Sequence, residues 1–361
     1  MRVKTLGELC NIASGGTPSR SQSSYWNDGT IPWIKIGNIK GKYVGNADEY
    51  ITQEGLDNSS AKMFSKGTIL YTIFATLGEV GILTIDACTN QAIAGIAIKD
   101  PSEVLSDYLF YYLKSKKAYV NGIGRGVAQN NINMSILRGF EVPLPSISEQ
   151  RQIVSVLDAL SKVIGFRQKQ LTELDNLIKA RFVELTESTD TVPTKMGDIA
   201  TYINGYAFKP VQWEDAGYPI VRIQNLNDAN APYNYYSGKI ADKYLIHNGD
   251  VLVSWATHLE AYIWKGEEAW LNQHIFKVVF DKIEVDKTYF VYACEEALRQ
   301  AFRNAHGFKP TMEHIKKADF DAAVVKLPEM HIQKEFATFV KQVDKSKVVV
   351  QKAISKSYSL I

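Results

Sequence analysis

Side-chain types that read the edges of nucleic-acid bases gather in loops of both halves of this 361-residue chain. Arg and Lys hydrogen-bond to guanine, Asn and Gln to adenine, and loops of small residues let the backbone approach phosphate. For any one such residue, the alternative is an ordinary solvated loop side chain. The candidates in the first half are Ser14, Thr17, Ser19, Arg20, Lys35, Asn38, Lys40, Arg125, Gln129, Asn130 and Asn131, with Lys42 in the same run as Lys40. Those in the second half are Asn204, Tyr206, Lys209, Arg222, Gln224, Asn225, His258, Lys309 and Thr311.

Catalytic motifs do not accompany these clusters. Adenine methylation would need a cofactor loop after a strand and an Asn-Pro-Pro-aromatic turn, and the sequence contains no Pro-Pro dipeptide. A GxxxxGK[ST] phosphate loop is also absent, which argues against an ATP-driven motor. The glycine cluster Gly122–Gly126 follows a helical pattern and is interpreted as a loop. Cys10, Cys88 and Cys294 lie far apart, which predicts isolated buried thiols rather than a disulfide or a zinc site.

The composition is that of a folded protein with two domains of ordinary size. Hydrophobic residues make up 45% and charged residues 22%, and the formal net charge is only +2. A protein that gripped many phosphates alone would be more basic, so we expect local basic clusters or a partner that adds positive charge. The N-terminus lacks the apolar core of a signal peptide, and we expect a cytoplasmic protein that does not enter a membrane.

A long amphipathic stretch from Pro143 to about Leu185 separates the two sets of clusters. Ser148, followed by Glu149 and Gln150, is the expected N-terminal cap of a helix there. A helix of about 40 residues would be about 60 Å long, which suits a spacer or a dimerisation seam rather than a catalytic pocket. Its heptad positions are Ile153, Leu157, Leu160, Ile164, Arg167, Leu171, Leu174, Ile178, Arg181 and Leu185.

The second half repeats the motifs of the first half in the same order. Gly67 and Gly249 are 182 positions apart, and the same offset separates Asn90-Gln91 from Asn272-Gln273. This agreement predicts a duplicated unit, in which a globular domain is followed by a long helix. The second helix is expected to be shorter and to pack antiparallel on the first, with the two domains related by an approximate twofold. Its heptad positions are Phe336, Val340, Val343, Lys347, Val350, Ile354, Ser357 and Ile361.

Short strand patterns separated by turns predict that the globular domains are rich in β-structure. Ile31–Ile36 and Ile93–Ile98 have the pattern of strands, and Ser106–Tyr119 has helical spacing. Trp33 and Phe74 lie in such runs and are predicted to pack in a core, with stacking on a base as the alternative. The predicted fold class is α+β. The predicted division is a globular domain at residues 1–145, a spacer helix at 146–190, a second globular domain at 191–327 and a second spacer helix at 328–361.

The order of these motifs resembles the specificity subunit of type I restriction-modification enzymes. The resemblance rests on Leu6-Gly7-Glu8, Gly15-Gly16-Thr17-Pro18 and Ile31-Pro32-Trp33-Ile34 at the start of the domain. It continues with Gly126–Asn133, Val142-Pro143-Leu144-Pro145 and Glu149-Gln150 at its end. The second copy departs from the pattern, because His306–Thr311 lacks the Gln and Asn residues of the first and no acidic residue directly precedes Gln333.

The resemblance implies two target-recognition domains that each read one half of a split double-stranded DNA sequence. Two helices, packed as an antiparallel coiled coil, would fix the gap between the half-sites and dock two methyltransferase subunits, and two restriction and motor subunits would join for cleavage. The chain itself would not be an enzyme and would hold no cofactor or metal. S-adenosylmethionine, ATP and Mg are expected only in the partner subunits.

Two other functions remain compatible with the sequence. One is a stand-alone DNA-binding or assembly-blocking derivative of such a subunit, which a shorter second helix would favour. The other is a self-sufficient methyltransferase or nuclease, which would need catalytic motifs that the sequence does not display.

Overall fold

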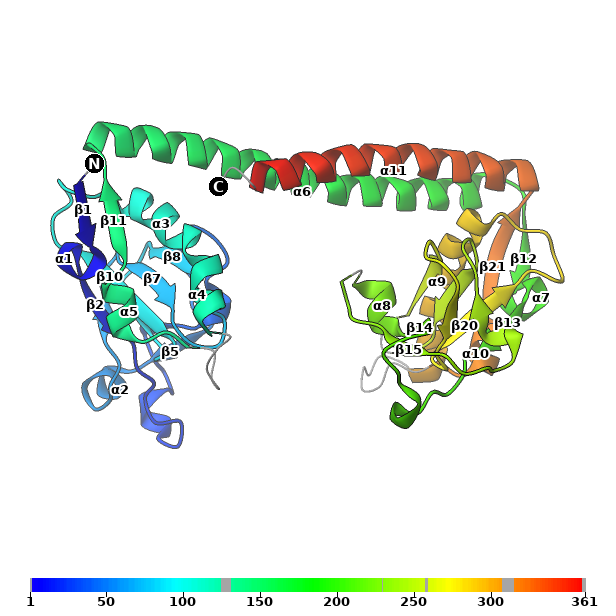
Figure 1. Cartoon of the computed structure of the whole chain (residues 1–361), viewed down its shortest axis with the longest axis horizontal. Helices are drawn as coiled ribbons and strands as arrows, with labels where there is room; N and C mark the ends of the chain where they lie inside the picture. The colour runs from blue at the N-terminus through cyan, green and yellow to red at the C-terminus, as the bar shows by residue number, and fades with distance from the viewer. Residues whose placement is uncertain (1, 125–130, 229, 257–258, 307–314, 359–361) are drawn as a thin grey trace. The chain divides into compact units, whose positions relative to one another are not determined.

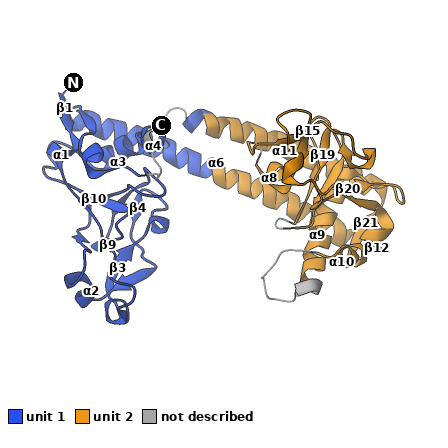
Figure 2. Ribbon diagram, turned by 60° about the horizontal axis from the view of Figure 1, so that its bottom comes forward, with its two compact units in different colours: residues 1–166, 356–361 blue, residues 167–355 orange. Residues whose placement is uncertain are grey.

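The chain forms two compact units, each with its own sheets and core (Figures 1 and 2). The structure, a computed structural model, describes residues 2–124, 131–228, 230–256, 259–306 and 315–358. Unit 1 comprises Met1–Phe166 and Lys356–Ile361, and unit 2 comprises Arg167–Ser355.

Unit 1 contains two larger sheets and a two-stranded sheet that pairs its first strand with its last. The two-stranded sheet pairs β1 (Arg2–Thr5) with β11 (Glu141–Leu144), antiparallel. The five-stranded sheet has the order β2 (Cys10–Ser14), β10 (Ile93–Ile98), β7 (Ile69–Thr72), β8 (Val80–Leu83) and β4 (Tyr43–Val44). The four-stranded sheet has the order β5 (Glu49–Ile51), β3 (Ile31–Ile34), β9 (Ala87–Thr89) and β6 (Met63–Phe64).

Unit 2 repeats this arrangement strand by strand. The two-stranded sheet pairs β12 (Thr191–Lys195) with β21 (Val324–Pro328). One four-stranded sheet has the order β13 (Thr201–Asn204), β20 (Ile275–Val279), β17 (Val251–Ser254) and β18 (Glu260–Ile263). The other has the order β15 (Asn234–Tyr236), β14 (Tyr218–Val221), β19 (Ala269–Leu271) and β16 (Leu245–Ile246). Only β4 lacks a counterpart among the described strands of unit 2, so the predicted internal repeat and α+β fold class are confirmed.

Further helices cover the sheets and close the cores. In unit 1, α3 buries Leu109 and Leu113 against the five-stranded sheet, together with Val120 from α4. The single helix predicted over Ser106–Tyr119 is divided in two, because α3 ends before Lys116 and α4 begins after it. The helices of unit 1 are α1 (Leu6–Leu9), α2 (Gln53–Asp57), α3 (Ser106–Ser115), α4 (Lys117–Gly124) and α5 (Met134–Arg138). Those of unit 2 are α7 (Met196–Ile199), α8 (Ile223–Asn227), α9 (Lys287–His306) and α10 (Lys317–Ala322).

The first long helix, α6, runs without interruption from Ile147 to Ser188. Its predicted cap, Ser148, is wrong, because Ser148 lies inside the helix and Ser146, two residues earlier, is the cap. The Ser146 hydroxyl accepts from the Glu149 amide at 3.3 Å, and the Glu149 carboxylate accepts from the Ser146 amide at 2.8 Å. This reciprocal pair is a capping box, which requires Ser and Glu three residues apart.

The second long helix, α11 (Met330–Tyr358), packs antiparallel on the second half of α6 within unit 2. Arg181 of α6 pairs with Glu335 near the start of α11 at 2.6 Å, and Lys347, further along α11, pairs with Asp175 at 2.6 Å. The residue numbers therefore run in opposite directions along the contact, as predicted. Heptad residues fill the seam, and its buried members in unit 2 are Ile178, Leu185, Phe336, Val340, Val343 and Ile354.

One buried glutamine anchors the start of each long helix to its globular unit. Gln150 is 0% exposed, and its amide oxygen accepts from the backbone N–H of Leu105 at 2.9 Å. Its amide nitrogen donates to the carbonyls of Glu103 and Pro145 at 2.9 and 3.1 Å.

The same anchor occurs in unit 2. Gln333 is 3% exposed, accepts from the N–H of Asp286 at 3.0 Å and donates to the carbonyl of Pro328 at 2.8 Å. Each glutamine therefore joins three segments, which are the last strand of the unit, the start of the long helix and the segment before α3 or α9.

The three cysteines are buried and unpaired, as the sequence predicts. Burial raises the pKa of Cys10 to about 12 and that of Cys88 to about 11. A thiol needs its thiolate form to act as a nucleophile, so neither cysteine is reactive at neutral pH. Among the described helices, none combines the length and apolar character that crossing a membrane requires.

Replacing Gln150 by alanine should lower the free energy of unfolding by about 2–4 kcal/mol, because it leaves a buried N–H and two carbonyls without partners. Chemical denaturation followed by tryptophan fluorescence measures this change. Gln152→Ala is the matched control, since Gln152 is exposed on the same turn of α6. Equal stability of the two variants would contradict the anchoring role of Gln150.

Candidate nucleic-acid interface

The loop that follows β2 in unit 1 depends on two glycines. A Cβ on Gly15 would lie 2.0 Å from Thr89 Oγ1, and one on Gly16 would lie 2.3 Å from the carbonyl carbon of Ser60. The Gly15 N–H donates to the carbonyl of Ile93 and the Gly16 N–H to that of Thr89, each at 2.9 Å. The loop backbone therefore lies so close to its neighbours that only glycine fits.

Two tryptophans also hydrogen-bond the backbone of this loop. The indole N–H of Trp26 donates to the carbonyl of Ser19, and that of Trp33 donates to the carbonyl of Gly16, both at 3.0 Å. The two rings pack edge to face with 5.1 Å between their centroids. Because Trp33 is buried in the sheet, the loop has a fixed backbone path rather than a loose one.

The small polar residues of this loop have defined positions. Ser14 ends β2, where it pairs with Ala94 of β10. The Thr17 hydroxyl donates to the Gln91 side chain, and the Ser19 hydroxyl lies 2.8 Å from that of Ser21. Ser19 is exposed, whereas Ser14 and Thr17 are half-buried.

A charged triad lies beside this loop. Arg20 places its guanidinium 3.6 Å from the ring centroid of Trp26 and pairs with Glu49 Oε2 at 2.5 Å. The other carboxylate oxygen of Glu49 accepts from the Lys35 ammonium. The hydrogen bond from Lys35 lowers the pKa of the Glu49 carboxyl; partial burial opposes this effect, and Arg20 reinforces it. Glu49 is therefore ionised at neutral pH, and its link to the two cations is lost only in acid.

The segment after β3 forms a tight turn that carries Lys35, Asn38 and Lys40. Asn38 Oδ1 accepts from the backbone N–H of Lys35 at 2.8 Å, and its amide donates to Asp48 at 2.8 Å. Lys40 is exposed beyond this turn. Asn38 thus shapes the turn, while the side chain of Lys40 extends into solvent.

In unit 2, Gly205 takes the place of Gly15. Its Cβ would lie 2.2 Å from the carbonyl oxygen of Asn272, and its N–H donates to the carbonyl of Ile275 at 3.0 Å. The preceding Asn204 is the exposed last residue of β13. Tyr206 packs edge to face on Phe208, with 4.9 Å between the centroids, so its ring forms part of a small core.

A turn equivalent to that of Lys35 follows β14 in unit 2. Arg222 takes the position of Lys35, and Asn225 Oδ1 accepts from the Arg222 N–H at 3.1 Å, as Asn38 does in unit 1. The guanidinium of Arg222 lies 5.1 Å from the ring centroid of Trp213. Gln224 lies within this turn and is exposed, and Lys209, which precedes β14, is exposed as well.

The family model of the type I restriction modification DNA specificity domain matches residues 1–176 and 189–357. The chain belongs to this family. One match falls on each half, in agreement with the duplicated topology.

Two relatives illustrate the similarity. The type I restriction enzyme MjaIX specificity subunit of Methanocaldococcus jannaschii is 30% identical over 251 residues, which are 62% of this chain and 57% of that protein. The EcoBI specificity subunit of Escherichia coli is 30% identical over 158 residues, which are 42% of this chain and 33% of that protein. The chain thus spans less than two thirds of the length of either relative.

A solved structure gives the same fold. It is described as showing the basis of complex assembly and conformational transition of the type I R-M system, and the match covers 99% of this chain and 93% of that one. The TM-score is 0.60 at 15% identity, so this likeness concerns the fold.

Some predicted contact residues of this specificity-domain protein lie in other surroundings than expected. Asn225 is buried, and its amide donates to the carbonyls of Ala231 and Pro232, so we now expect it to hold its loop rather than to touch a base. Asn131 forms an isolated β-bridge with Phe74. Contact with DNA stays a prediction for the others. Six predicted residues lie outside the described residues, namely Arg125, Gln129, Asn130, His258, Lys309 and Thr311.

A further loop residue of this specificity-domain protein, Lys42, pairs with Asp107 at 2.8 Å and Asp158 at 2.6 Å and so fastens its loop to α3 and α6. Its contact with DNA stays a prediction, whereas the core position predicted for Phe74 is wrong. Phe74 was expected in the core and is 40% exposed. It lies beyond the end of β7, next to Ala75 with its φ of 60°, so the alternation of the strand no longer applies there.

Sequence reasoning also missed the tryptophans and the carboxylate that lie beside Arg20, Lys35 and Arg222. Trp26 and Trp213 each directly follow a 3₁₀ turn, η1 (Ser23–Tyr25) and η3 (Pro210–Gln212). Each tryptophan lies between the glycine loop and the next strand, and this common position in the two halves of the sequence was a usable signal. Glu49 gave no signal, since its partners lie far from it in the sequence. In the described part of the specificity-domain chain, no group of three His, Cys, Asp or Glu side chains could hold a metal ion.

Gly15→Ala should destabilise unit 1 by about 1–3 kcal/mol, because the added methyl group meets backbone and a β-strand threonine that cannot move aside. The measurement is urea denaturation followed by tryptophan fluorescence. Gly37→Ala is the matched control, since nothing lies within 4 Å of its Cβ position. If both variants unfold at the same urea concentration, the close contact between the loop and Thr89 does not require glycine at position 15.

Proposed function

We propose that this chain is a non-catalytic DNA-specificity subunit that reads a bipartite double-stranded target, with one half-site for each unit. The observation that carries this proposal is the duplicated topology with equivalent loops, in which Gly15 and Gly205 occupy the same place and so do Lys35 and Arg222. Two copies of one reading surface suit two half-sites better than one continuous site.

Base reading would take place at the loops described above. Exposed side chains such as Arg20, Lys40 and Gln224 would meet base edges or phosphates, and the glycine-anchored backbone would fix where they can reach. Fixed loops favour tight binding, because less conformational freedom is lost on binding.

The proposed division of labour keeps the boundaries expected from the sequence. Residues 1–145 and 191–327 would be target-recognition domains, and residues 146–190 and 328–361 would be spacer segments. The helices α6 (Ile147–Ser188) and α11 (Met330–Tyr358) fall within these spacers, which supports their role in setting the distance between half-sites.

Catalysis would reside in partner subunits. The sequence lacks the motifs of an adenine methyltransferase and of an ATP-driven motor. S-adenosylmethionine, ATP and Mg would therefore be bound by the methyltransferase and restriction subunits.

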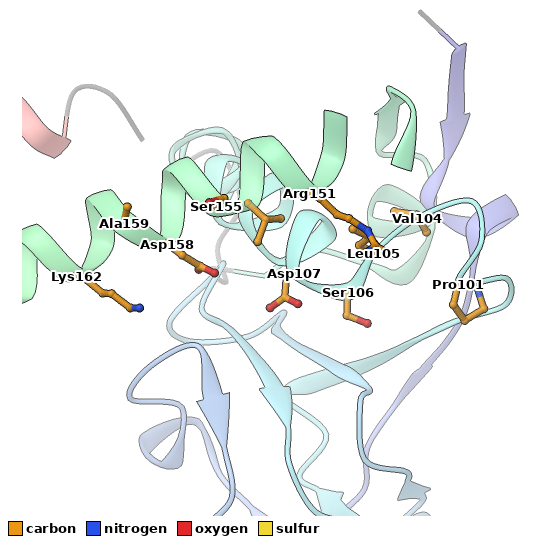
Figure 3. A pocket seen from close by; sticks show the side chains of 11 residues that line it. Pro101, Val104, Leu105, Ser106, Asp107, Arg151, Ser155, Asp158, Ala159 and Lys162 are labelled. Atoms are coloured by element: carbon orange, nitrogen blue, oxygen red, sulfur yellow. The ribbon is translucent and has the colours of Figure 1, made fainter. Parts of the chain in front are cut away.

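Equivalent grooves in the two units are the proposed docking sites of two methyltransferase subunits. In unit 1 an open groove of about 750 Å³ lies between α6 and the start of α3 (Figure 3). In unit 2 a groove of about 990 Å³ lies between α11 and α9. The repeat relates Arg151, Ser155 and Lys162 of α6 to Lys334, Thr338 and Lys345 of α11, all 183 positions apart. A site present in both copies suits a partner that binds twice.

The two grooves differ in charge. Asp107 and Asp158 balance Arg151 and Lys162 in the first. The second is lined by four lysines and two acidic residues, which are Lys265, Lys334, Lys341, Lys345, Asp286 and Asp344. The same partner surface should therefore bind the second groove with the stronger dependence on salt.

Co-expression with the cognate methyltransferase subunit should yield a complex that methylates adenines at two short sequences separated by an unspecified gap. Sequencing that detects methylated bases measures the target and the gap together. Methylation by the chain alone would overturn the non-catalytic assignment. DNA binding without co-purification of a methyltransferase would favour a stand-alone derivative instead.

Ser155→Arg should reduce the number of bound methyltransferase subunits from two to one, and Ser155→Arg with Thr338→Arg should abolish their binding. Both residues are exposed in the grooves, so a bulky charged side chain blocks docking without disturbing a core. Mass measurement of the purified complex reports the number of subunits. Gln170→Arg, at an exposed position of α6 outside both grooves, should retain two.

A further inference from the structure

Each unit holds an arginine over a tryptophan that closes a 3₁₀ turn. In unit 1, Trp26 follows η1, and Arg20 lies 3.6 Å from its ring centroid. In unit 2, Trp213 follows η3, and Arg222 lies 5.1 Å from its ring centroid. The tryptophans are equivalent in the repeat, since each ends the 3₁₀ turn between the glycine loop and the next strand.

The two arginines are not equivalent in the repeat. Arg20 precedes its 3₁₀ turn, whereas Arg222 follows β14, at the position that Lys35 occupies in unit 1. The pairing of arginine with tryptophan is therefore not a simple relic of the duplication, because the two units supply the cation from different places. An arrangement reached twice from different positions points to a requirement of function.

The acid beside the cations also differs between the units. Glu49 pairs with Trp33 across β5 and β3, and the same register places Asn234 opposite Ile220 across β15 and β14. Unit 1 therefore has a carboxylate where unit 2 has a neutral amide.

Two side chains of unit 2, Asn234 at the position of Glu49 and Arg222 at the position of Lys35, retain unused polar atoms. The buried Oδ1 of Asn234 and the buried Nε of Arg222 have no hydrogen-bond partner among the described residues. No acidic side chain of the described residues forms an ion pair with Arg222, whereas Arg20 is held by Glu49 at 2.5 Å.

The chemistry of an arginine held close to an indole suits one ligand in particular. The guanidinium carries its N–H donors in one planar fork, and the neighbouring ring limits the directions in which that fork can point. The O6 and N7 atoms of guanine accept two such donors side by side, and this is the commonest specific contact in the major groove. Arg20 is accessible for this contact, since 54% of its side chain is exposed.

We propose that Arg20 and Arg222 are the guanine-reading residues of the two units, and that Glu49 is a positioning residue that orients Arg20. Arg222 is oriented by Trp213 without an acid. This inference rests on the proposed function, because it assigns base contacts within the DNA-reading units.

The test uses duplexes in which 7-deazaguanine replaces single guanines. This base keeps its pairing and its phosphate but has a C–H in place of the N7 acceptor. The complex of the full chain with methyltransferase should bind the duplex with one critical replacement in each half-site roughly 5- to 150-fold more weakly than the unmodified target. A half-site without guanine would overturn the assignment for its unit.

Arg20→Lys should remove the effect of 7-deazaguanine in one half-site only, and Arg222→Lys should remove it in the other. Lysine keeps the charge but loses the planar pair of donors. Arg299→Lys is the matched control, because Arg299 pairs with Glu296 on α9. A variant that weakens binding to modified and unmodified duplexes equally would show a phosphate contact and overturn the assignment.

Glu49→Gln tests whether Glu49 orients the Arg20 side chain or only neutralises its charge. If Glu49 orients Arg20, the variant loses the 7-deazaguanine effect in the half-site of Arg20 while its affinity for unrelated DNA rises, because one negative charge has left the surface. An unchanged 7-deazaguanine effect overturns the role of Glu49. Absence of any sequence preference in the wild-type complex would instead contradict the proposed function.

Discussion

The buried glutamine at the start of each long helix is the interaction on which the rest of the structure depends. A rigid helix can orient a globular domain only if the joint between them is also rigid. Gln150 and Gln333 provide that joint by hydrogen-bonding backbone groups of three separate segments inside a core. Unpaired polar groups in such a place would be costly, so the joint is satisfied in essentially one geometry.

The two units share their backbone-shaping residues and differ in the side chains that project from them. Gly15 and Gly205 bring a loop against a neighbouring strand, and Asn38 and Asn225 close the turn after the third strand in the same way. On this common frame, Glu49 is replaced by Asn234 and Lys35 by Arg222. Two different half-sites would require two domains that share a backbone structure and differ in the side chains on its loops.

The sequence predicted the parts of the structure that follow from periodicity. The heptad positions, the internal repeat and the buried cysteines depend on patterns that each segment carries by itself. Ser146 shows a signal that was present but misinterpreted, since Ser followed by Glu three residues later marks the cap.

Other features could not be predicted because their partners are distant in sequence. In the sequence, Lys42 resembles a free loop cation, but in the folded unit Asp107 and Asp158 lie beside it. The same holds for Glu49, whose partner Arg20 is on a loop that packs against it only in the folded unit. Charge alone therefore identifies candidate DNA-binding residues, but the fold decides which of them remain available.

The two-stranded sheets have a topological consequence. β1 pairs with β11 from Arg2 to Thr5, and β12 pairs with β21 from Thr191 to Lys195, so the chain enters and leaves each globular body through adjacent antiparallel strands. Each globular domain is thus joined to the rest of the chain through one pair of adjacent strands. Exchange of one globular domain for another with different loops, cut at these paired strands, would keep both long helices, provided that the new domain supplies the backbone groups that Gln150 or Gln333 hydrogen-bonds. The paired strands therefore divide the chain into globular domains that carry the variable loops and long helices that join them, and the loops can change while the helices are kept.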